Sequence, residues 1–199
     1  MRDEDFRPGR RRFAKAAVAG VAGLALGGPA LAQAIDPLAG DGTGEPLTRR
    51  VSGAISRDWR DYFDSVENEA ILADITDRSL HYWGADGFYR IYPTSVPMSE
   101  EMVRRGRTEI VAKRPEPEWR PTPTMIERNP DLPRYVGPGP DNPLGVRAMN
   151  LGWQYYLIHG GNDIRKIGRQ SSSGCIGLYN EHILEVYDRA RIGTPVLVI

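Results

Sequence analysis

Apolar residues along the chain gather in short runs that predict a mainly β fold. Two of these runs, 79–83 and 88–92, flank Gly84-Ala85-Asp86-Gly87 and predict a β-hairpin, because glycine lets the backbone turn tightly. The closing run, 195–199, is uninterrupted and predicts a strand in the centre of a sheet. The predicted strands are 70–74, 79–83, 88–92, 108–112, 154–158 and 195–199.

Two segments show the apolar spacing of three and four residues that is typical of a helix on a core. Residues 55–65 predict a short amphipathic helix. A second helix begins at Asn180, which we expect to be its N-cap, and ends near Gly193. Its apolar stripe consists of Ile183, Leu184, Val186, Tyr187 and Ala190.

Nine prolines lie between Pro115 and Pro143. Because proline has no N–H to donate, this density excludes a central strand or a helix and predicts a long ordered loop or a lid. Loops of this length are usually functional or disordered. We expect Trp119 and Tyr135 to anchor the loop to the domain, with the lining of a substrate groove as the alternative.

The N-terminal residues have the pattern of an export signal. The basic segment 10–15 precedes a small apolar run that ends in Ala30-Leu31-Ala32, a small-residue cleavage pattern. This run has about 13 residues, too few for a membrane-spanning anchor. The paired arginines resemble the twin-arginine export signal, and an ordinary secretory signal is the alternative. We expect a signal peptide at 1–32, a tether with a short helix at 33–66, and one domain at 67–199.

Composition narrows the possible functions. The chain has 26 Lys and Arg against 26 Asp and Glu, so it lacks the basic excess that is typical of nucleic-acid binding. Without residues 1–32 it would hold 20 basic and 23 acidic residues, a mildly acidic domain that is large enough to need no disulfide or metal. Cys175 is the single cysteine, which excludes an intrachain disulfide and argues against a structural zinc site.

The chemistry concentrates around Cys175 and His159, which lie 16 residues apart among glycines and serines. A free thiol is only a few per cent thiolate at neutral pH, so a cysteine nucleophile needs a base, and a histidine at a strand end supplies one. The small residues before Cys175 also let backbone N–H groups point outward as an oxyanion hole requires. The alternative is a buried, inert cysteine and a structural histidine.

Three motifs in order change this balance: His159-Gly160-Gly161-Asn162, Ile167-Gly168, and Ser172-Ser173-Gly174-Cys175-Ile176-Gly177-Leu178-Tyr179-Asn180. Together they resemble the signature of the L,D-transpeptidase catalytic domain of the YkuD/ErfK-like bacterial cell-wall enzymes. The segments 117–123, 138–145 and 193–196 follow the order of that family too. The resemblance covers about residues 67–199.

The resemblance implies a mainly β, sandwich-like domain with a short C-terminal helix and a long proline-rich loop, and no cofactor or metal. It implies that Cys175 is the nucleophile, that His159 is the general base, and that the backbone carbonyl of Gly160 orients His159. The oxyanion hole and pocket would be formed by the amides of Gly174 and Cys175 together with Ser172 and Ser173. Expected substrate-binding residues are Trp119, Asn162, Arg169, Gly177 and Asn180.

The implied reaction begins with attack on a peptidoglycan stem tetrapeptide and release of its terminal D-alanine. The acyl group then passes to an amine, which gives a 3→3 cross-link or attaches an outer-membrane protein or lipoprotein to the wall, in the periplasm of a Gram-negative bacterium. Alternatives are an L,D-carboxypeptidase of the same fold and a non-catalytic wall-binding module. A poised Cys175 would alkylate well below its free pKa, whereas a structural cysteine would not.

Some residues depart from the family pattern. Gly177 stands where arginine is usual, and a guanidinium that would pair with a substrate carboxylate or shape the cysteine pocket is therefore missing. We consider Arg169, Arg165 and Arg147 as substitutes. Gly161 replaces a usual threonine, and Ser173 a frequent histidine. His81 and His182 show no metal-ligand spacing and are expected at the surface.

Overall fold

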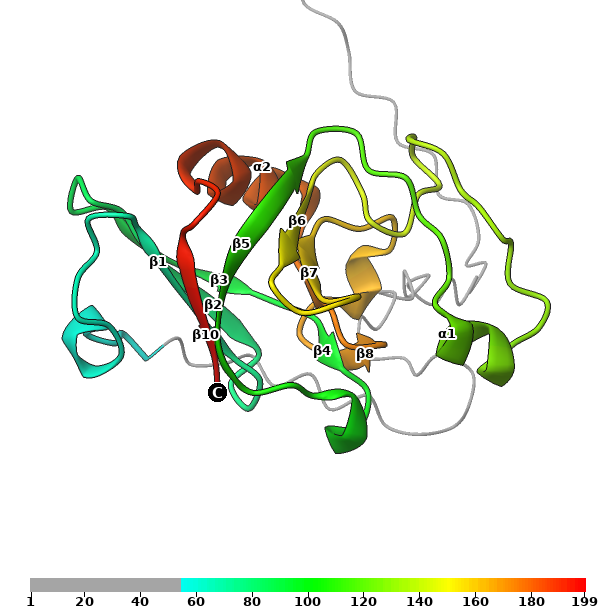
Figure 1. Ribbon diagram of the computed structural model, residues 1–199, viewed down its shortest axis with the longest axis horizontal. Coiled ribbons are helices and arrows are strands. Elements are labelled where there is room, and N and C mark those ends of the chain that lie inside the picture. Colours follow the sequence, from blue (N-terminus) through cyan, green and yellow to red (C-terminus); the bar gives the residue numbers. More distant parts are fainter. Residues whose placement is uncertain (1–54) are drawn as a thin grey trace, which may run out of the picture. The chain divides into compact units, whose positions relative to one another are not determined.

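A computed structural model describes residues 55–199, and the expected signal peptide and most of the expected tether lie outside them. Figure 1 shows strands wrapped around a core with few helices. The strands of the main sheet in this part of the chain are β1 (Ala70–Asp74), β2 (Ser79–Trp83), β3 (Tyr89–Pro93), β5 (Gly106–Arg114), β6 (Ala148–Leu151), β7 (Leu157–His159), β9 (Ile176–Gly177) and β10 (Pro195–Val198). Their order is β3-β2-β1-β10-β5-β6-β7-β9. A two-stranded sheet pairs β4 (Val96–Pro97) with β8 (Gln170–Ser172).

The long strand β5 joins the two halves of the main sheet. Its first half pairs with β10, with Glu109 opposite Pro195, and its second half pairs with β6, with Arg114 opposite Ala148. The register shifts between Ile110 and Ala112, and such an irregularity bends a strand and increases its twist. The sheet therefore curls until its two halves face each other, which gives the expected sandwich-like arrangement.

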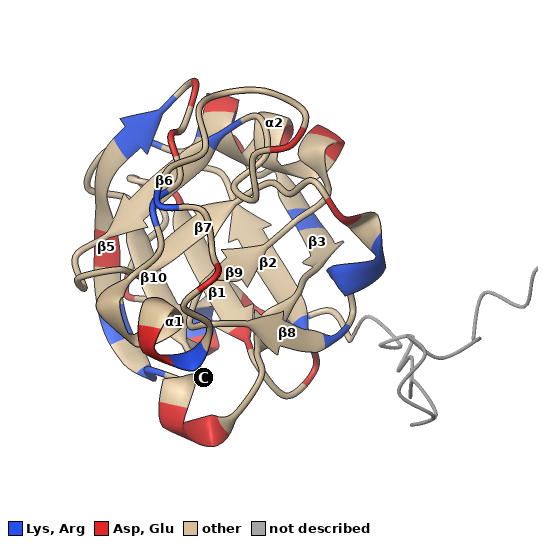
Figure 2. Cartoon of the chain, turned by 90° about the vertical axis from the view of Figure 1, so that its right-hand side faces the viewer, with Lys and Arg blue, Asp and Glu red and all other residues tan. Residues whose placement is uncertain are grey.

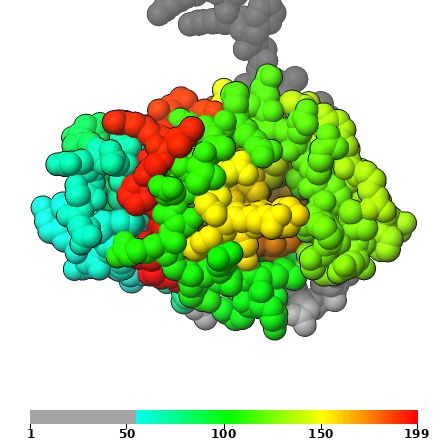
Figure 3. Space-filling model, in the orientation of Figure 1, coloured from blue at the N-terminus to red at the C-terminus, as the bar shows by residue number. Residues whose placement is uncertain are grey.

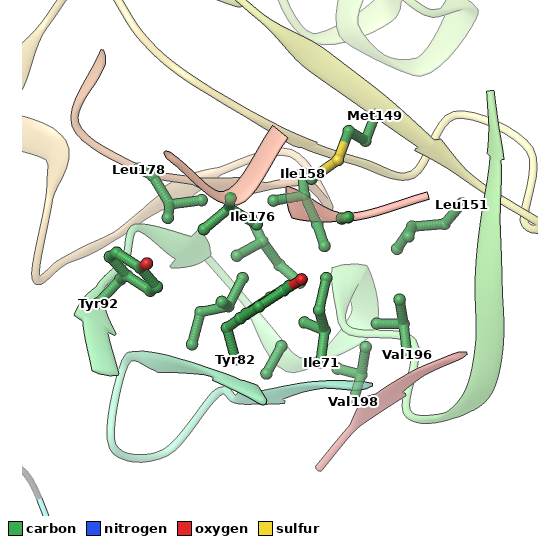
Figure 4. Close-up of a cluster of buried hydrophobic side chains, with 14 of the residues drawn as sticks. Ile71, Tyr82, Tyr92, Met149, Leu151, Ile158, Ile176, Leu178, Val196 and Val198 are labelled. Atoms are coloured by element: carbon green, nitrogen blue, oxygen red, sulfur yellow. The ribbon is translucent and has the colours of Figure 1, made fainter. Parts of the chain in front are cut away.

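The main core lies between these two halves. Figure 4 shows side chains of β1, β2, β3 and β10 packed against side chains of β6, β7 and β9. Tyr82 and Ile71 on one side and Met149 and Ile158 on the other are at most 1 % exposed. A second cluster covers the other face of β1 and β2 and contains Phe63, Ala70, Leu72 and Trp83. Burial on both faces explains why every residue of β1 is buried.

The helices are short. The helix α2 (Asn180–Arg189) buries Ile183 and Val186. The expectation that the proline-rich segment excludes a helix is wrong, because α1 (Pro123–Arg128) lies in it. This helix begins at Pro123, where no N–H donor is needed. Three 3-10 turns complete the described part, η1 (Trp59–Asp61), η2 (Glu100–Met102) and η3 (Ile164–Lys166). None of the helices within residues 55–199 is long and apolar enough to cross a membrane.

Several predictions from the apolar pattern are confirmed. The hairpin of β2 and β3, the strand at 70–74, and the position of the last strand inside the sheet between β1 and β5 agree with the sequence. Others are wrong. Residues 55–65 form only η1 rather than a longer helix, and Gln154 to Tyr156 precede strand β7 instead of belonging to it. The N-cap of α2 is Tyr179, and Asn180 is the first helical residue.

Candidate active site

Strand pairing places Cys175 and His159 on the same face of the sheet. The strands β7 and β9 are parallel, with Ile158 opposite Ile176 and His159 opposite Gly177. Side chains alternate along a strand, so position 175, two residues before Gly177, faces the same way as His159. The fold thus brings together two reactive side chains that are 16 residues apart in the sequence.

The imidazole of His159 is held in one tautomer. Its Nδ1 lies 2.5 Å from the carbonyl oxygen of Gly160, which can only accept a hydrogen bond, so Nδ1 carries the proton. The lone pair is then on Nε2, where a base needs it. Burial, assisted by the positive charge of Lys166, lowers the pKa of His159 to about 4, although the hydrogen bond to the Gly160 carbonyl raises it. His159 is therefore a neutral base at neutral pH.

The thiol of Cys175 is half-buried and protonated. Among residues 55–199 its hydrogen-bond partner is the carbonyl of Tyr155, with Sγ 3.5 Å from the oxygen, rather than the ring of His159. Burial raises the pKa of Cys175 to about 11, and the backbone N–H of Leu157 acts in the opposite direction. The resting site holds a neutral thiol and a neutral imidazole. At neutral pH a thiol with a raised pKa is mostly protonated, which differs from the thiolate of a poised cysteine.

The turn before Cys175 requires a glycine. Gly174 has φ +128°, and a Cβ there would also stand 3.4 Å from the Tyr156 ring. The hydroxyl of Ser172 donates to the carbonyl of Cys175 at 2.5 Å and accepts the N–H of Gly174 at 3.4 Å. The second bond is long, so it holds the Gly174 N–H only weakly.

The segment that contains Cys175 and the segment that contains His159 both border a cavity of about 480 Å³. In Figure 3 a hollow separates the yellow residues around β6 and β7 from the yellow-green proline-rich loop, with orange atoms at its base. The proline-rich loop (residues 115–143) covers the cavity with side chains of Trp119, Met125, Arg128, Leu132 and Val136. The cavity is thus enclosed by residues that are far apart in the sequence.

Asn142 fixes the proline-rich loop. It is fully buried, and its Nδ2 donates to the carbonyls of Pro117 at 2.7 Å and Gly137 at 2.9 Å. Its Oδ1 accepts the N–H of Leu144 at 2.8 Å. One amide therefore ties the two ends of the loop together, which explains how a segment with nine prolines is ordered without a strand ladder.

Most of the expected site residues line this cavity: Trp119, His159, Gly160, Asn162, Ser172, Ser173, Cys175 and Gly177. Gly174 is buried in the adjacent turn. The cavity does not include Asn180, Arg169, Arg165 or Arg147. The side chain of Asn180 forms hydrogen bonds to the backbone of Gly161 and so positions the loop after His159. Tyr135 is 44 % exposed and outside the cavity.

Sequence reasoning missed four residues that shape the site: Ser95, Arg128, Lys166 and Asn142. Ser95 comes from the segment before β4, and its backbone exchanges two hydrogen bonds with Gly177. The role of Asn142 could have been suspected from the sequence, because it lies within the family-like segment 138–145. Arg128 and Lys166 could not be found in this way, because α1 and η3, which end at them, are too short to show a period.

The expectation for His81 is also wrong. It is 1 % exposed, with Nδ1 2.9 Å from the hydroxyl of Tyr89 and Nε2 3.1 Å from the hydroxyl of Ser79. Both faces of β2 are buried, so a histidine in this strand has no access to solvent. His182 is half-buried and packs against Tyr92 and Tyr179.

The sequence is similar to those of known L,D-transpeptidases. The family model described as the L,D-transpeptidase catalytic domain matches residues 68–198. A Fuscovulum blasticum protein, named as an L,D-transpeptidase in the ATP synthase subunits region, is 49 % identical over 96 % of this chain and 97 % of its own length. The Escherichia coli protein named as the L,D-transpeptidase YbiS is 38 % identical over 68 % of this chain, which spans only 46 % of that relative.

A solved structure shows the same fold. The crystal structure of L,D-transpeptidase 3 from Mycobacterium tuberculosis superposes with a TM-score of 0.55 over 66 % of this chain and 61 % of that one, at 16 % sequence identity. The family match covers the sheet, the cysteine and histidine segments and the proline-rich loop together. On these grounds the chain belongs to the L,D-transpeptidase catalytic-domain family.

Proposed function

We propose that this chain is a peptidoglycan L,D-transpeptidase in which Cys175 attacks the stem tetrapeptide and His159 is the general base. The observation that carries the proposal is the position of both side chains on one face of β7 and β9, at the wall of a cavity of about 480 Å³. A cavity of this size accommodates a peptide ligand of a few residues.

The pKa values define how the first step proceeds. Because the thiol starts protonated and the imidazole starts neutral, the proton leaves Sγ for Nε2 of His159 as the sulfur–carbon bond forms. The thiol first turns from the Tyr155 carbonyl toward the ring. The N–H groups of Gly174 and Cys175 stabilise the negative oxygen of the tetrahedral intermediate.

The second half of the reaction returns the proton. As the carbon–nitrogen bond breaks, His159 donates its proton to the departing D-alanine amine, which leaves a thioester on Cys175. Neutral His159 then takes a proton from the incoming amine of the acceptor, and the new amide forms as Sγ departs and is reprotonated. The Gly160 carbonyl bound to Nδ1 stabilises the ring while it is positively charged.

The proposal includes an exported enzyme, because residues 1–32 have the pattern of a twin-arginine signal peptide and the substrate lies outside the cytoplasm. The acceptor is an amine of a second stem peptide or of an envelope protein. Export is tested by following a full-length reporter fusion, with the paired Arg10-Arg11 replaced by lysines as the control.

Mass spectrometry of products from a purified disaccharide-tetrapeptide tests the reaction itself. The expected product of the full-length chain is a cross-linked dimer that has lost D-alanine, absent with Cys175→Ala. A trimmed tripeptide alone would show that water is the acceptor under those conditions. No product and no acyl-enzyme mass on Cys175 would contradict the proposed function.

A further inference from the structure

Arg128 is a cation of the cavity that is held by neutral groups. Its Nη2 donates to the hydroxyl of Ser173 at 2.9 Å, and its Nη1 lies 3.6 Å from the sulfur atoms of both Met98 and Met102. Its Nε donates to the carbonyl of Thr124 at 3.3 Å. Of the ion pairs formed within residues 55–199, none includes Arg128. The guanidinium is therefore anchored at the cavity without a carboxylate.

The other arginines near the site have other partners or do not line the cavity. Arg165 is 80 % exposed and pairs with Asp163 at 2.8 Å. Arg147 donates to the carbonyls of Pro115 and Val146. Arg169 does not line the cavity. None of the three replacements considered from the sequence thus presents a guanidinium to the cavity.

The cavity also contains other charged groups. Lys166 lines it, together with Asp141 and Asp163, and Asp163 is neutralised by Arg165. Residue 177 offers no cation, because it is a glycine, and a Cβ there would overlap the hydroxyl of Ser95. In Figure 2 the colours of both charge signs meet on α1, where Arg128 ends the helix beside Glu127. Arg128 is the arginine that reaches the cavity from this loop.

The position of Arg128 relates it to one part of the substrate. Its anchor, Ser173, precedes the nucleophile Cys175 by two residues. In the proposed reaction the residue expelled from the tetrapeptide carries a free carboxylate, one residue beyond the carbonyl that is attacked, and consecutive Cα atoms are about 3.8 Å apart. We propose that Arg128 binds this terminal carboxylate and makes the enzyme specific for donors with a free C-terminal acid. This inference rests on the proposed function.

The chemistry favours a change in which the guanidinium of Arg128 leaves its neutral partners and binds the substrate carboxylate. A planar guanidinium pairs with a carboxylate through two parallel hydrogen bonds, which are stronger than bonds to a hydroxyl or a thioether. Apolar lining by Trp119, Leu132 and Val136 lowers the local dielectric constant and strengthens that pair. Arg128 sits on the loop that covers the cavity, so binding of the carboxylate also holds the loop over the donor.

Two matched donors test the inference: a disaccharide-tetrapeptide with a free C-terminal carboxylate and the same molecule with a C-terminal carboxamide. For the full-length chain we expect kcat/KM to favour the acid by roughly 10- to 100-fold, as for one charge-assisted hydrogen-bonded pair. In Arg128→Gln this preference should fall to near one, mainly through a higher KM for the acid. Arg128→Lys should retain part of it. Arg134→Gln removes the same charge from the same loop outside the cavity and should keep the full preference.

The outcomes separate the inference from the function on which it rests. If Arg128→Gln slows the acid and the amide equally, Arg128 only supports the loop and the inference is wrong, while the transpeptidase reaction stands. The same conclusion follows if the unmodified chain turns over both donors equally well. If that chain forms no acyl-enzyme with either donor, the proposed function fails and the inference fails with it.

Discussion

The side-chain amide of Asn180 forms hydrogen bonds to the backbone of Gly161 through both its oxygen and its nitrogen. Its Oδ1 accepts the N–H of Gly161 at 3.1 Å, and its Nδ2 donates to the carbonyl of the same residue, also at 3.1 Å. The same Oδ1 accepts the N–H of Val146 at 3.3 Å. The first residue of α2 therefore holds the loop that follows His159, and a Cβ at Gly160 would overlap this amide.

Replacement of Asn180 should damage the site through geometry. In Asn180→Ala the backbone groups of Gly161 lose their partners, which costs about 1–3 kcal/mol of unfolding free energy. The Gly160 carbonyl then no longer fixes the His159 ring, so kcat should fall by roughly tenfold or more with little change in KM. Urea unfolding and steady-state kinetics measure the two effects.

Asn180→Asp provides the graded comparison. It keeps the oxygen that accepts from Gly161 but loses the donor to the carbonyl, so its kcat and stability should fall between those of the native chain and Asn180→Ala. A change in KM without a change in kcat would show instead that Asn180 contacts substrate.

The free enzyme should resist alkylation at neutral pH. Burial raises the pKa of Cys175 to about 11, so the reactive thiolate is on the order of one molecule in ten thousand at pH 7. The rate of iodoacetamide labelling should therefore rise through an apparent pKa near 11. Cys175→Ala gives the background, because the chain has no other cysteine.

Turnover should follow a different pH profile from alkylation. The rate depends on neutral His159, whose pKa is lowered to about 4, so kcat/KM should fall only as pH drops toward 4 and stay level through pH 7. An apparent alkylation pKa well below 8, lost in His159→Ala, would show instead a preformed thiolate–imidazolium pair. Slow alkylation of Cys175 at pH 7 is therefore expected both of the enzyme and of an inert module. Detection of the acyl-enzyme by mass spectrometry distinguishes the two.

Two buried histidines should make the fold sensitive to mild acid. Burial lowers the pKa values of His81 and His159 to about 4, against 6.5 in an unfolded chain. Above pH 6.5 the two histidines are neutral in both the folded and the unfolded state. Below pH 6.5 they bind protons in the unfolded state but not in the folded state, so stability falls as pH drops from 6.5 toward 4. At pH 5 the loss is roughly 2 kcal/mol for each histidine.

Urea unfolding at pH 7.5 and pH 5 measures this dependence. The window lies above the titration of most carboxylates, which isolates the histidines. His81→Gln, which cannot be protonated, should lose stability at both values of pH but show a smaller pH dependence, and the remainder comes from His159 and from His182, whose pKa burial also lowers. An unchanged pH dependence in this variant would mean that His81 is protonated in the folded protein.

The parts of the fold that local patterns control were predictable from the sequence. The hairpin of β2 and β3 follows from a glycine turn between two apolar runs, and β10 from an uninterrupted run. The strand β6 was missed because Ala148-Met149-Asn150-Leu151 is too short to show a period. It is stabilised by neighbours on both sides, β5 and β7, and this information is not local.

The same limit applies to the site. Cys175 and His159 stood out because their chemistry is rare in the chain and their motifs resemble a family. Arg128 and Ser95 have common side chains, and only the course of the proline-rich loop and of β4 brings them to the cavity. Asn180 was assigned to substrate and to the N-cap because its polar side chain fits both roles, whereas its partner is Gly161.

Gly177 and Ser95 should be coupled in stability. The N–H of Ser95 donates to the carbonyl of Gly177 at 2.8 Å, and the N–H of Gly177 donates back at 3.1 Å, so the two backbones lie side by side. A Cβ at 177 would overlap the Ser95 hydroxyl and stand 3.8 Å from Cε1 of His159. Gly177→Ala should therefore cost about 1–3 kcal/mol and lower activity, since the overlap is relieved only by movement of Ser95.

The double variant distinguishes crowding from other causes. Ser95→Gly removes the overlapping hydroxyl and opens room beside residue 177, so Ser95→Gly with Gly177→Ala should be more stable than the sum of the two single effects predicts. Urea unfolding of the four proteins closes this cycle, and Gly177→Arg, which restores the residue usual in the family, should likewise be tolerated better with Ser95→Gly. Strictly additive effects would mean that Ser95 rotates away freely. In that case packing against Ser95 would not require a glycine at position 177.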